Sequence, residues 1–322
     1  MILMRKVSER LSGGEREIVV ARTLEEVEAL GSIWNEMHQS ESQPTLDAQI
    51  DRYLAVVNAS GDEVRPYVLI FGNTSHPEAM IIGRTENHRL PIRLGYKTLL
   101  RPTLKCLNIV YGGILGQPTS ATCFLVAGDL LKRLRNGEFD MVNFNHLRTD
   151  TSFYQAVREV PGLLTRDYFP VKEPHWKTSL PDSYEKFLSS RSKNTRHNIR
   201  RYVNRLSSKY GARLRIEYFS NEAQVDQLFK STVEVAQKTY QHNLGGTFVD
   251  NVMMRGQVRL FVDRKLFKAY VLYIDDKPCA FWNGTRYGKT FFTWTTGYDP
   301  AFNDDRLGLF LLVKLVEALC VD

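Results

Sequence analysis

Hydrophobic and polar positions follow two spacings along the chain, and these predict strands and helices in a recurring order. In the first half, residues 17–21 read as a strand, and apolar side chains three and four residues apart from Leu24 to Met37 predict a helix. Thr23 and Glu26 have the spacing of a capping box at its start. The further elements expected here are a helix at 46–58, paired strands at 67–71 and 79–84, an apolar β-branched stretch at 90–115, a helix at 120–135, a strand at 141–144 and a helix at 150–159.

The second half repeats this order. An extended segment is expected at 171–180, and Asp182 with Glu185 predicts another capping box. The elements that follow are a helix to residue 190, a basic helix at 191–210, a strand at 214–219, a helix at 222–238 capped by Ser220, a helix at 248–263, and strands at 267–274, 279–286 and 290–296. The pattern predicts an α+β (α/β) fold of two units, 1–165 and 166–322, each a mostly antiparallel mixed sheet flanked by helices.

Charge distinguishes the two halves. The chain has 322 residues, 43% of them apolar, and a net charge of +7. Residues 1–165 hold 18 Lys and Arg against 19 Asp and Glu, whereas residues 166–322 hold 25 against 17. The basic excess of the second half indicates an anionic partner such as a nucleotide cofactor, RNA or acidic lipid.

Cysteine spacing and hydropathy exclude several classes of protein. The four cysteines are far apart in the sequence and form neither a C-x-x-C pair nor a His-containing cluster, which predicts reduced, packed thiols and no metal site. No apolar run approaches the 18 or so residues that span a bilayer, and the N-terminal apolar residues are too few for a signal peptide. A cytoplasmic location is the resulting expectation.

The stretch from 290 to 318 predicts an anion-binding turn. An aromatic and β-branched strand runs through a polar turn at 298–305 into an apolar helix that begins near Arg306. The first N–H groups of a helix lack internal acceptors and favour negative charge. We therefore expect an acyl donor to dock at this turn.

Four motifs in the second half carry a family resemblance: Ser192 to Arg201 (SKNTRHNIRR), 259–262 (RLFV), 275–280 (DDKPCA) and 297–302 (GYDPAF). With them, the segment from residue 180 resembles the GNAT-like acetyltransferase domain of the CelD-type family, associated with cellulose and exopolysaccharide synthesis. Segments 110–113 (VYGG) and 139–144 (FDMVNF) make the first half similar to a degenerate first GNAT unit. The Fem-type peptidyltransferases, which use aminoacyl-tRNA, share this tandem plan.

The resemblance implies acyl transfer from acetyl-CoA or another acyl-CoA to an amine or hydroxyl. It assigns the pantetheine arm to the backbone of Trp294, Thr295 and Thr296, and the pyrophosphate to the turn and helix start. The residues implied there are Asn303, Arg306, Gly308 and Leu309. The family also places a strand after this helix, where the sequence ends at 320–322, so the strand is absent, supplied by the first half, or outside the given sequence.

The turn departs from the family pattern Q/R-x-x-G-x-G/A. If Gly308 is the first glycine, Asp305 replaces Gln/Arg and Phe310 replaces the last small residue. Asp304 and Asp305 would then oppose a pyrophosphate, with Arg306 offsetting one of them. The alternative is that one of these aspartates only caps the helix.

The basic segment 191–210 has seven Lys and Arg and no acidic residue. Lys193, Arg196 and Arg200 share one face, and an apolar stripe ending at Tyr210 marks the buried side. Such a helix is either simply solvated or binds coenzyme A phosphates, tRNA, acidic lipid or a nucleotide sugar.

Acyl transfer needs a base for the acceptor, and four residues are candidates. Tyr240 and His242 lie in a polar break between helices, where loops commonly supply site residues. Tyr298 and Asp299 lie in the turn, where Asp299 with the following proline could instead serve only turn geometry. Trp282 and Trp294 are expected in the core.

Three functions remain. The first is an acyl-CoA-dependent N- or O-acyltransferase acting on a small molecule or a polysaccharide precursor. The second is a Fem-like transferase that uses aminoacyl-tRNA, and the third is a non-catalytic scaffold of polysaccharide or envelope assembly.

Overall fold

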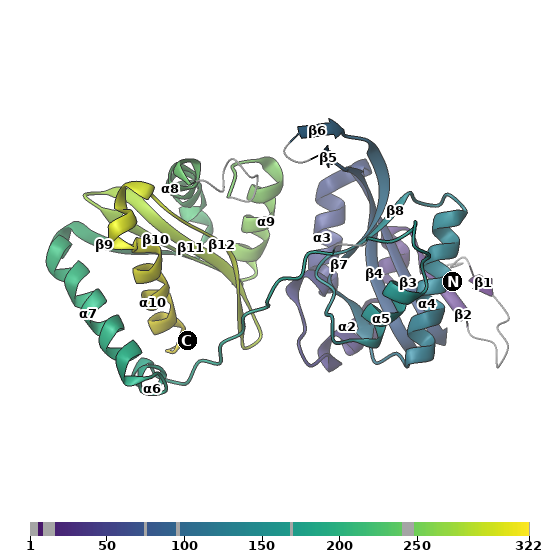
Figure 1. Cartoon of the computed structure of the whole chain (residues 1–322), viewed down its shortest axis with the longest axis horizontal. Helices are drawn as coiled ribbons and strands as arrows, with labels where there is room; N and C mark the ends of the chain where they lie inside the picture. Colours follow the sequence, from purple (N-terminus) through teal and green to yellow (C-terminus); the bar gives the residue numbers. More distant parts are fainter. Residues whose placement is uncertain are drawn as a thin grey trace. The chain divides into compact units, whose positions relative to one another are not determined.

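The computed structural model describes residues 6–8, 17–73, 76–94, 97–167, 170–239 and 248–321. The chain divides into two compact units, Met1–Lys172 and Glu173–Asp322, which are described separately (Figure 1). Each unit is a β-sheet flanked by helices, as the hydrophobic pattern predicts. In the described residues no helix has the length and apolar character needed to cross a membrane.

Unit 1 is built on a six-stranded sheet. Its strand order is β1 (Lys6–Ser8), β2 (Glu17–Ala21), β3 (Val64–Asn73), β4 (His76–Arg89), β7 (Thr103–Gly116) and β8 (Met141–Phe144). All neighbours are antiparallel except β7 and β8, which are parallel and joined through α4 (Ser120–Arg135). A parallel pair requires such a crossover, because a tight turn can join only antiparallel strands.

Helices cover both faces of this sheet because its strands are apolar on both sides. Val20 and Leu69 pack with α4 and with α5 (Ser152–Glu159). Val19 and Val68, each one position earlier in its strand, pack with helices on the opposite face. Those helices are α1 (Leu24–Glu28), α2 (Gly31–Ser40) and α3 (Ile50–Ser60). Alternate side chains of a strand point to opposite faces, so one run of apolar residues serves two cores.

Several boundaries in unit 1 differ from expectation. The helix predicted over 24–37 is two helices, α1 and α2, separated at Ala29 and Leu30. Its predicted start is confirmed, since the Glu26 N–H donates to Thr23 Oγ1 at 3.2 Å and the Glu26 carboxylate accepts from the Thr23 N–H. A short 3-10 turn, η1 (Leu46–Ala48), precedes α3, and the 90–115 stretch holds β5 (Ile92–Leu94), β6 (Lys97–Leu100) and most of β7.

Unit 2 has a four-stranded antiparallel sheet. Its order is β12 (Thr290–Tyr298), β11 (Lys277–Tyr287), β10 (Phe267–Ile274) and β9 (Leu214–Phe219). α7 (Lys193–Tyr210) and α10 (Leu307–Leu319) pack on one face through Leu206, Phe310 and neighbouring apolar residues. α8 (Val225–Lys238) and α9 (Val252–Asp263) lie on the other face (Figure 1). Within the described residues β12 is an edge of this sheet.

Helix starts in unit 2 required correction. α6 (Tyr184–Ser189) is capped by Ser183, whose hydroxyl accepts from the Lys186 N–H at 3.2 Å, and Asp182 instead pairs with the Lys186 side chain. Ser220 does not cap the next helix, because the N-cap positions are Asn221 for the 3-10 turn and Gln224 for the α-helix. That helix is a 3-10 turn, η4 (Glu222–Gln224), followed by α8, and α9 starts at Val252 rather than 248.

All four cysteines are buried free thiols, as the sequence predicts. No group of three or more His, Cys, Asp or Glu able to hold a metal ion occurs in the part of the chain that the structure describes. Trp282 and Trp294 are partly buried, and the Trp294 ring packs 5.1 Å from that of Phe261.

Candidate functional site

The edge strand of unit 2, β12, carries a β-bulge. Asn283 pairs with Thr295 and Gly284 pairs with Thr293, so Trp294 is the extra residue on β12. A bulge bends the strand and disrupts its ladder locally. On an edge strand, the backbone groups that point away from the sheet remain available to a ligand.

A buried asparagine holds the bulge in place. Asn283 on β11 is fully buried, and its Oδ1 accepts from the Thr295 N–H at 3.0 Å and from the Thr295 hydroxyl at 2.8 Å. The Thr296 hydroxyl donates to the Phe281 carbonyl at 3.0 Å. Both threonine hydroxyls therefore form hydrogen bonds within the sheet. In this segment the groups that could bind a donor molecule are those of the backbone.

After β12 the chain forms a 3-10 turn, η6 (Pro300–Asp305), whose N-cap residue is Asp299. One carboxylate oxygen of Asp299 accepts from the Ala301 N–H at 3.0 Å, and the other pairs with Lys238 Nζ at 2.9 Å. Partial burial works to raise the pKa of Asp299, but the bonds from Lys238 and Ala301 outweigh it and lower the pKa below its usual value. A carboxylate held in this way is a weak proton acceptor.

Asp305 ends the turn as an internal ion. It is 8% exposed and accepts from Lys209 Nζ at 2.9 and 2.7 Å and from the Tyr210 hydroxyl. Hydrogen bonds from Lys209 and then Tyr210 lower the pKa of Asp305. Tyr202 donates to the carbonyls of Asp305 and Arg306. Lys209 of α7 thus offsets the charge of this carboxylate, which weakens its expected repulsion of a pyrophosphate.

α10 starts without a side-chain cap. Its N-cap is Arg306, in the left-handed conformation with φ 45° and ψ 46°, and neither Asp304 nor Asp305 caps the helix as the alternative expectation had it. The Arg306 side chain is exposed, and the first N–H groups of the helix, on Leu307 and Gly308, have no intrahelical acceptor. A cation beside free N–H groups is an arrangement that favours an anion.

Gly308 leaves the helix start open to close approach. A Cβ built there would lie 3.5 Å from Tyr298 Cδ1, an ordinary contact, so packing does not require glycine. The Tyr298 hydroxyl lies 3.3 Å from Asn303 Oδ1, and the Trp282 indole N–H donates to the Gly308 carbonyl at 3.1 Å. The fold thus brings together the predicted residues Tyr298, Asn303 and Gly308, while Leu309 is 47% exposed.

The other predicted residues are dispersed. Tyr240 and His242 lie outside the described residues. Lys193 and Arg200 are exposed on α7, and Arg196 donates to the carbonyls of Ser189 and Arg191 at the end of α6, which gives it a structural role. The roles suggested for all of these side chains stay predictions.

Sequence reasoning missed the residues that shape the turn. Tyr202, Lys209 and Tyr210 on α7 hold η6 from one side, and Lys238 at the end of α8 holds Asp299. The sequence pattern that could have indicated them is the spacing of Lys209 and Tyr210, seven and eight residues after Tyr202. This spacing puts the three side chains on adjoining faces of one helix. That spacing does not predict that their partner is Asp305, about 95 residues later in the sequence.

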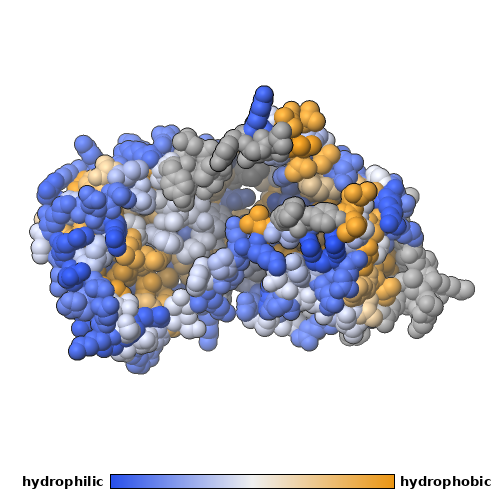
Figure 2. Space-filling model, viewed as in Figure 1, coloured by the Kyte–Doolittle hydropathy of each residue, from blue (hydrophilic) through white to orange (hydrophobic). Residues whose placement is uncertain are grey.

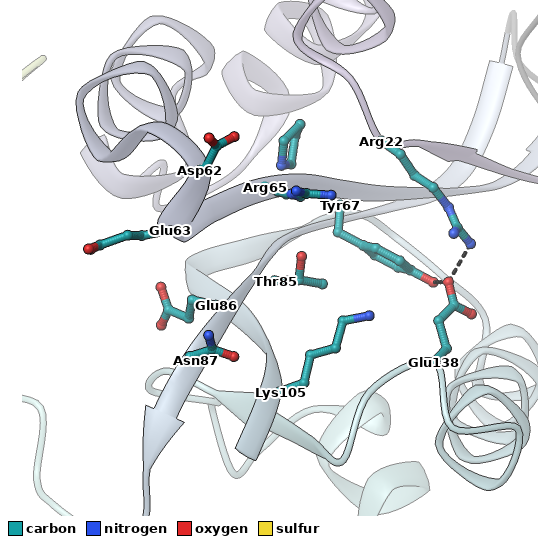
Figure 3. A pocket seen from close by; sticks show the side chains of 11 residues that line it. Arg22, Asp62, Glu63, Arg65, Tyr67, Thr85, Glu86, Asn87, Lys105 and Glu138 are labelled. Atoms are coloured by element: carbon teal, nitrogen blue, oxygen red, sulfur yellow. Dashed lines mark hydrogen bonds and ion pairs between the residues drawn. The ribbon is translucent and has the colours of Figure 1, made fainter. Parts of the chain in front are cut away.

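Unit 1 contains a polar pocket of about 410 Å³ (Figure 3). Its floor is Tyr67, whose hydroxyl donates to Glu138 at 2.8 Å, and Glu138 also accepts from Arg22 and from Arg133. Burial first, and the bond to Glu138, raise the pKa of Tyr67, so its hydroxyl stays protonated. The Glu138 carboxylate is thereby fully occupied.

The pocket walls carry both signs of charge. Asp62, Glu63 and Glu86 gather toward one end, and Lys105 extends toward the end where Arg22 and Glu138 meet (Figure 3). Arg65 also lines the pocket, and Glu138 adds a carboxylate at the Arg22 end, so the walls are mostly polar and suit a small polar molecule. Sequence inspection gave no hint of this pocket, because its residues come from five separate segments.

Comparison with known families bears on unit 2. Residues 193–322 match the sequence model of a family described as an acetyltransferase (GNAT) domain. The match begins at the first residue of α7 and includes β12, η6 and α10. It supports a transferase of the GNAT-like acetyltransferase class, whereas no curated protein matches the chain.

Solved structures are similar to this chain at low sequence identity. FemX is 9% identical with a TM-score of 0.50, covering 90% of this chain and 84% of FemX. A Bacteroides thetaiotaomicron protein of unknown function is 10% identical with a TM-score of 0.45, covering 93% and 86%. A probable N-acyltransferase from Enterococcus faecalis is 11% identical with a TM-score of 0.41, covering 95% of this chain and 63% of that protein. At such identity the likeness to FemX shows the fold alone.

Proposed function

We propose that unit 2 binds an acyl-CoA and transfers its acyl group to an amine or hydroxyl. The observation that carries the proposal is the path from the bulged edge strand β12, through η6, to the uncapped start of α10. Pairing of Asp305 with Lys209 reduces the electrostatic repulsion of an anion there. The GNAT domain match over residues 193–322 supports the same class of reaction.

In this proposal each part of the path has its own task. The backbone at Trp294, Thr295 and Thr296 binds the pantetheine arm, because the side chains there serve the core or the sheet. The N–H groups of Leu307 and Gly308, with Arg306 and the amide of Asn303, bind the pyrophosphate. The thioester supplies the activated acyl group, and the protein's contribution is to hold it next to the acceptor.

Four residues remain proposed for proton transfer from the acceptor: Tyr240, His242, Tyr298 and Asp299. Of these, Tyr298 is 39% exposed beside Gly308. Asp299 is the weakest base, because Lys238 and Ala301 hold it ionised. An amine acceptor that is already neutral would need little help from a base, so positioning can dominate the rate.

The acceptor we propose is a small molecule or a glycan precursor. The resemblance to the exopolysaccharide-associated family supports a sugar-linked amine or hydroxyl. A screen of amines and sugars that follows thiol release from acetyl-CoA would identify it.

Replacing Gly308 with alanine tests the donor site. We expect the Kd for acetyl-CoA to rise about tenfold, because a methyl group would occupy space that a phosphate needs against the backbone. The free energy of unfolding should change by less than about 0.5 kcal/mol, since the added Cβ makes only ordinary contacts. Isothermal titration calorimetry and urea denaturation measure the two quantities.

Two further variants give this test its control. Arg306→Gln should also weaken acetyl-CoA binding, because it removes a positive charge next to the pyrophosphate and does not fill the space that a phosphate occupies. Lys289→Gln removes an exposed cation from the turn between β11 and β12 and should leave the Kd unchanged. An absence of binding heat from the wild-type protein at millimolar acetyl-CoA would refute the acyl-CoA proposal.

The second candidate is a transferase that takes its acyl group from aminoacyl-tRNA. The observation in its favour is the solvent face of α7, where Lys193, Arg200, Arg201 and Arg205 are exposed with no acidic residue among them. An acid-free cationic helix can follow a phosphate backbone. The likeness to FemX adds only that the fold is shared.

Filter binding of tRNA would decide this second function. Arg200→Gln with Arg201→Gln should lower tRNA affinity about tenfold at low salt and reduce the salt dependence by about one to two in log–log slope. Lys230→Gln with Lys289→Gln, two exposed cations outside α7, is the matched control. Equal retention by both double variants would argue against α7, and no retention of tRNA by the wild type would remove the function. Consumption of either donor would exclude a purely structural scaffold.

A further inference from the structure

A β-ribbon arm, residues 87–105, extends from the sheet of unit 1. The last pair between β3 and β4 is Val64 with Glu86, and β8 first meets β7 at Cys106. Between these points the ladder pairs of β4 and β7 are with each other, from Asn87 with Lys105 to Arg89 with Thr103. The backbone of Lys105, at the base, also bonds to Asp140. The ribbon continues through the Leu90 N–H bond to the Pro102 carbonyl, at 3.0 Å, into β5 and β6.

The arm has two unlike faces. Alternate residues of a strand point to opposite sides, so Leu90 and Ile92 share a face with their cross-strand neighbours Pro102 and Leu100. The opposite face carries Asn87, Arg89, Arg101, Thr103 and Lys105. The arm is therefore amphipathic, with one apolar side and one cationic side.

Its apolar side chains face solvent. Leu90, Ile92, Leu99 and Leu100 are 37%, 44%, 53% and 64% exposed. Orange hydrophobic residues gather where β5 and β6 form the tip of the arm (Figure 2). A contiguous exposed apolar patch on a bare two-stranded ribbon indicates a surface that something covers.

The positive charge of the arm indicates the kind of surface that it binds. No Asp or Glu occurs between Glu86 and Asp129, and the arm itself contains Arg89, Lys97, Arg101 and Lys105 among its cations. Arg89, Lys97 and Arg101 are exposed, and Arg89 and Arg101 lie on the face opposite Leu90 and Ile92. Lys105, at the base of the arm, also lines the pocket of unit 1. An apolar face backed by a cationic face is typical of an element that lies in a membrane interface, where acyl chains lie beneath anionic headgroups.

We propose that this arm docks unit 1 on the surface of an anionic membrane. Leu90, Ile92 and Leu100 enter the boundary between headgroups and acyl chains, and the cations bind lipid phosphates. Leu99 is the extra residue where the register shifts between the Ile92–Leu100 and Arg93–Thr98 pairs, so it is not counted in the apolar face. Three such side chains cover much less than the roughly 800 Å² per partner of a stable protein interface, which favours lipid over a second protein. The strands of the tip have three and four residues, far short of a membrane span.

Sedimentation with vesicles tests this docking in the full chain. We expect binding to phosphatidylcholine vesicles that contain 30% phosphatidylglycerol and little binding to phosphatidylcholine alone. Ile92→Asn with Leu100→Asn should lower the partition coefficient at least tenfold, because the insertion is lost. Arg89→Gln with Arg101→Gln should lower it by about fivefold per cation removed, and added salt should have the same effect.

The control replaces exposed leucines elsewhere in unit 1. Leu163→Asn with Leu164→Asn removes side chains that are 66% and 99% exposed and should leave vesicle binding unchanged. Circular dichroism of each variant verifies the fold. The proposal is overturned if the wild type fails to bind anionic vesicles, or if the arm variants bind like the control. It is equally overturned if sedimentation velocity shows a dimer that the Ile92→Asn, Leu100→Asn variant dissociates, since a second copy would then cover the arm.

Discussion

Replacing Gly284 with alanine is expected to lower the free energy of unfolding by about 3 kcal/mol, at the upper end of overpacking costs. Gly284 lies on β11 opposite the β12 bulge, and a Cβ built there would come within 2.2 Å of the Phe292 carbonyl oxygen and 2.6 Å of the Phe291 ring. A ring can rotate away, but a carbonyl oxygen of the paired strand moves only if β12 moves. Urea denaturation followed by tryptophan fluorescence measures the loss.

The same substitution should also weaken donor binding if β12 is the donor strand, because the bulge geometry would shift. Gly256 on α9 provides the control, since nothing lies within 4 Å of a Cβ built there. Gly256→Ala should raise stability by about 0.5 to 1 kcal/mol, because alanine is the better helix former. A Gly284→Ala protein as stable as the wild type would mean that the bulge does not approach β11 as closely as described.

The second large effect is expected at Asp305. Asp305→Asn should lower the free energy of unfolding by about 2 kcal/mol, because charge-assisted hydrogen bonds from Lys209 and Tyr210 lose their charged acceptor inside the turn. Loosening η6 would also displace the start of α10, so acetyl-CoA affinity should fall together with stability. Denaturation and calorimetry on one preparation would measure both.

The pH dependence follows from the lowered pKa of Asp305. A carboxyl group whose pKa falls on folding contributes stability above its unfolded pKa of about 3.9. That contribution is lost as the pH drops through the lower folded value. The difference in stability between the wild type and Asp305→Asn should therefore be constant from pH 7 to about pH 5 and should shrink below about pH 4.

Asp304 is the matched control for this experiment. It is the neighbouring carboxylate and is exposed, so Asp304→Asn should change stability by less than about 0.5 kcal/mol. Equal effects of the two substitutions would show that the Lys209 and Tyr210 contacts contribute nothing specific. A stability difference for Asp305→Asn that grows toward acid pH would reverse the assigned sign.

Local features were predictable from the sequence. The predicted bounds of α4, β8, β9 and β10 are those observed, and the capping box of Thr23 and Glu26 is present. The turn at Asp275 and Asp276, between two strands predicted from the sequence, joins β10 and β11 with φ of 50° and 60°. The spacing of hydrophobic residues, the helix caps and the short turns depend on residues a few positions apart. The sequence of one segment is therefore enough to predict them.

The position of the turn between β12 and α10 was also predicted, but not its electrostatics. The sequence places a strand, a polar turn and a helix at 290–318, and the structure forms β12, η6 and α10 there. From sequence alone Asp305 was expected either to repel the donor or to cap a helix. Its actual partners, Lys209 and Tyr210, are separated from it by 96 and 95 residues, and no local pattern selects them.

By itself, then, the sequence determined the order of elements, the two α+β units, the basic character of α7 and the place of the turn. Only the tertiary structure decided which charges meet. It buried Asp305 against Lys209, inserted Trp294 as a bulge beside Asn283, and gathered the pocket in unit 1 around Tyr67. The physical reason is that periodicity and capping act along the chain, whereas ion pairing, strand register and cavities depend on segments that only folding brings together.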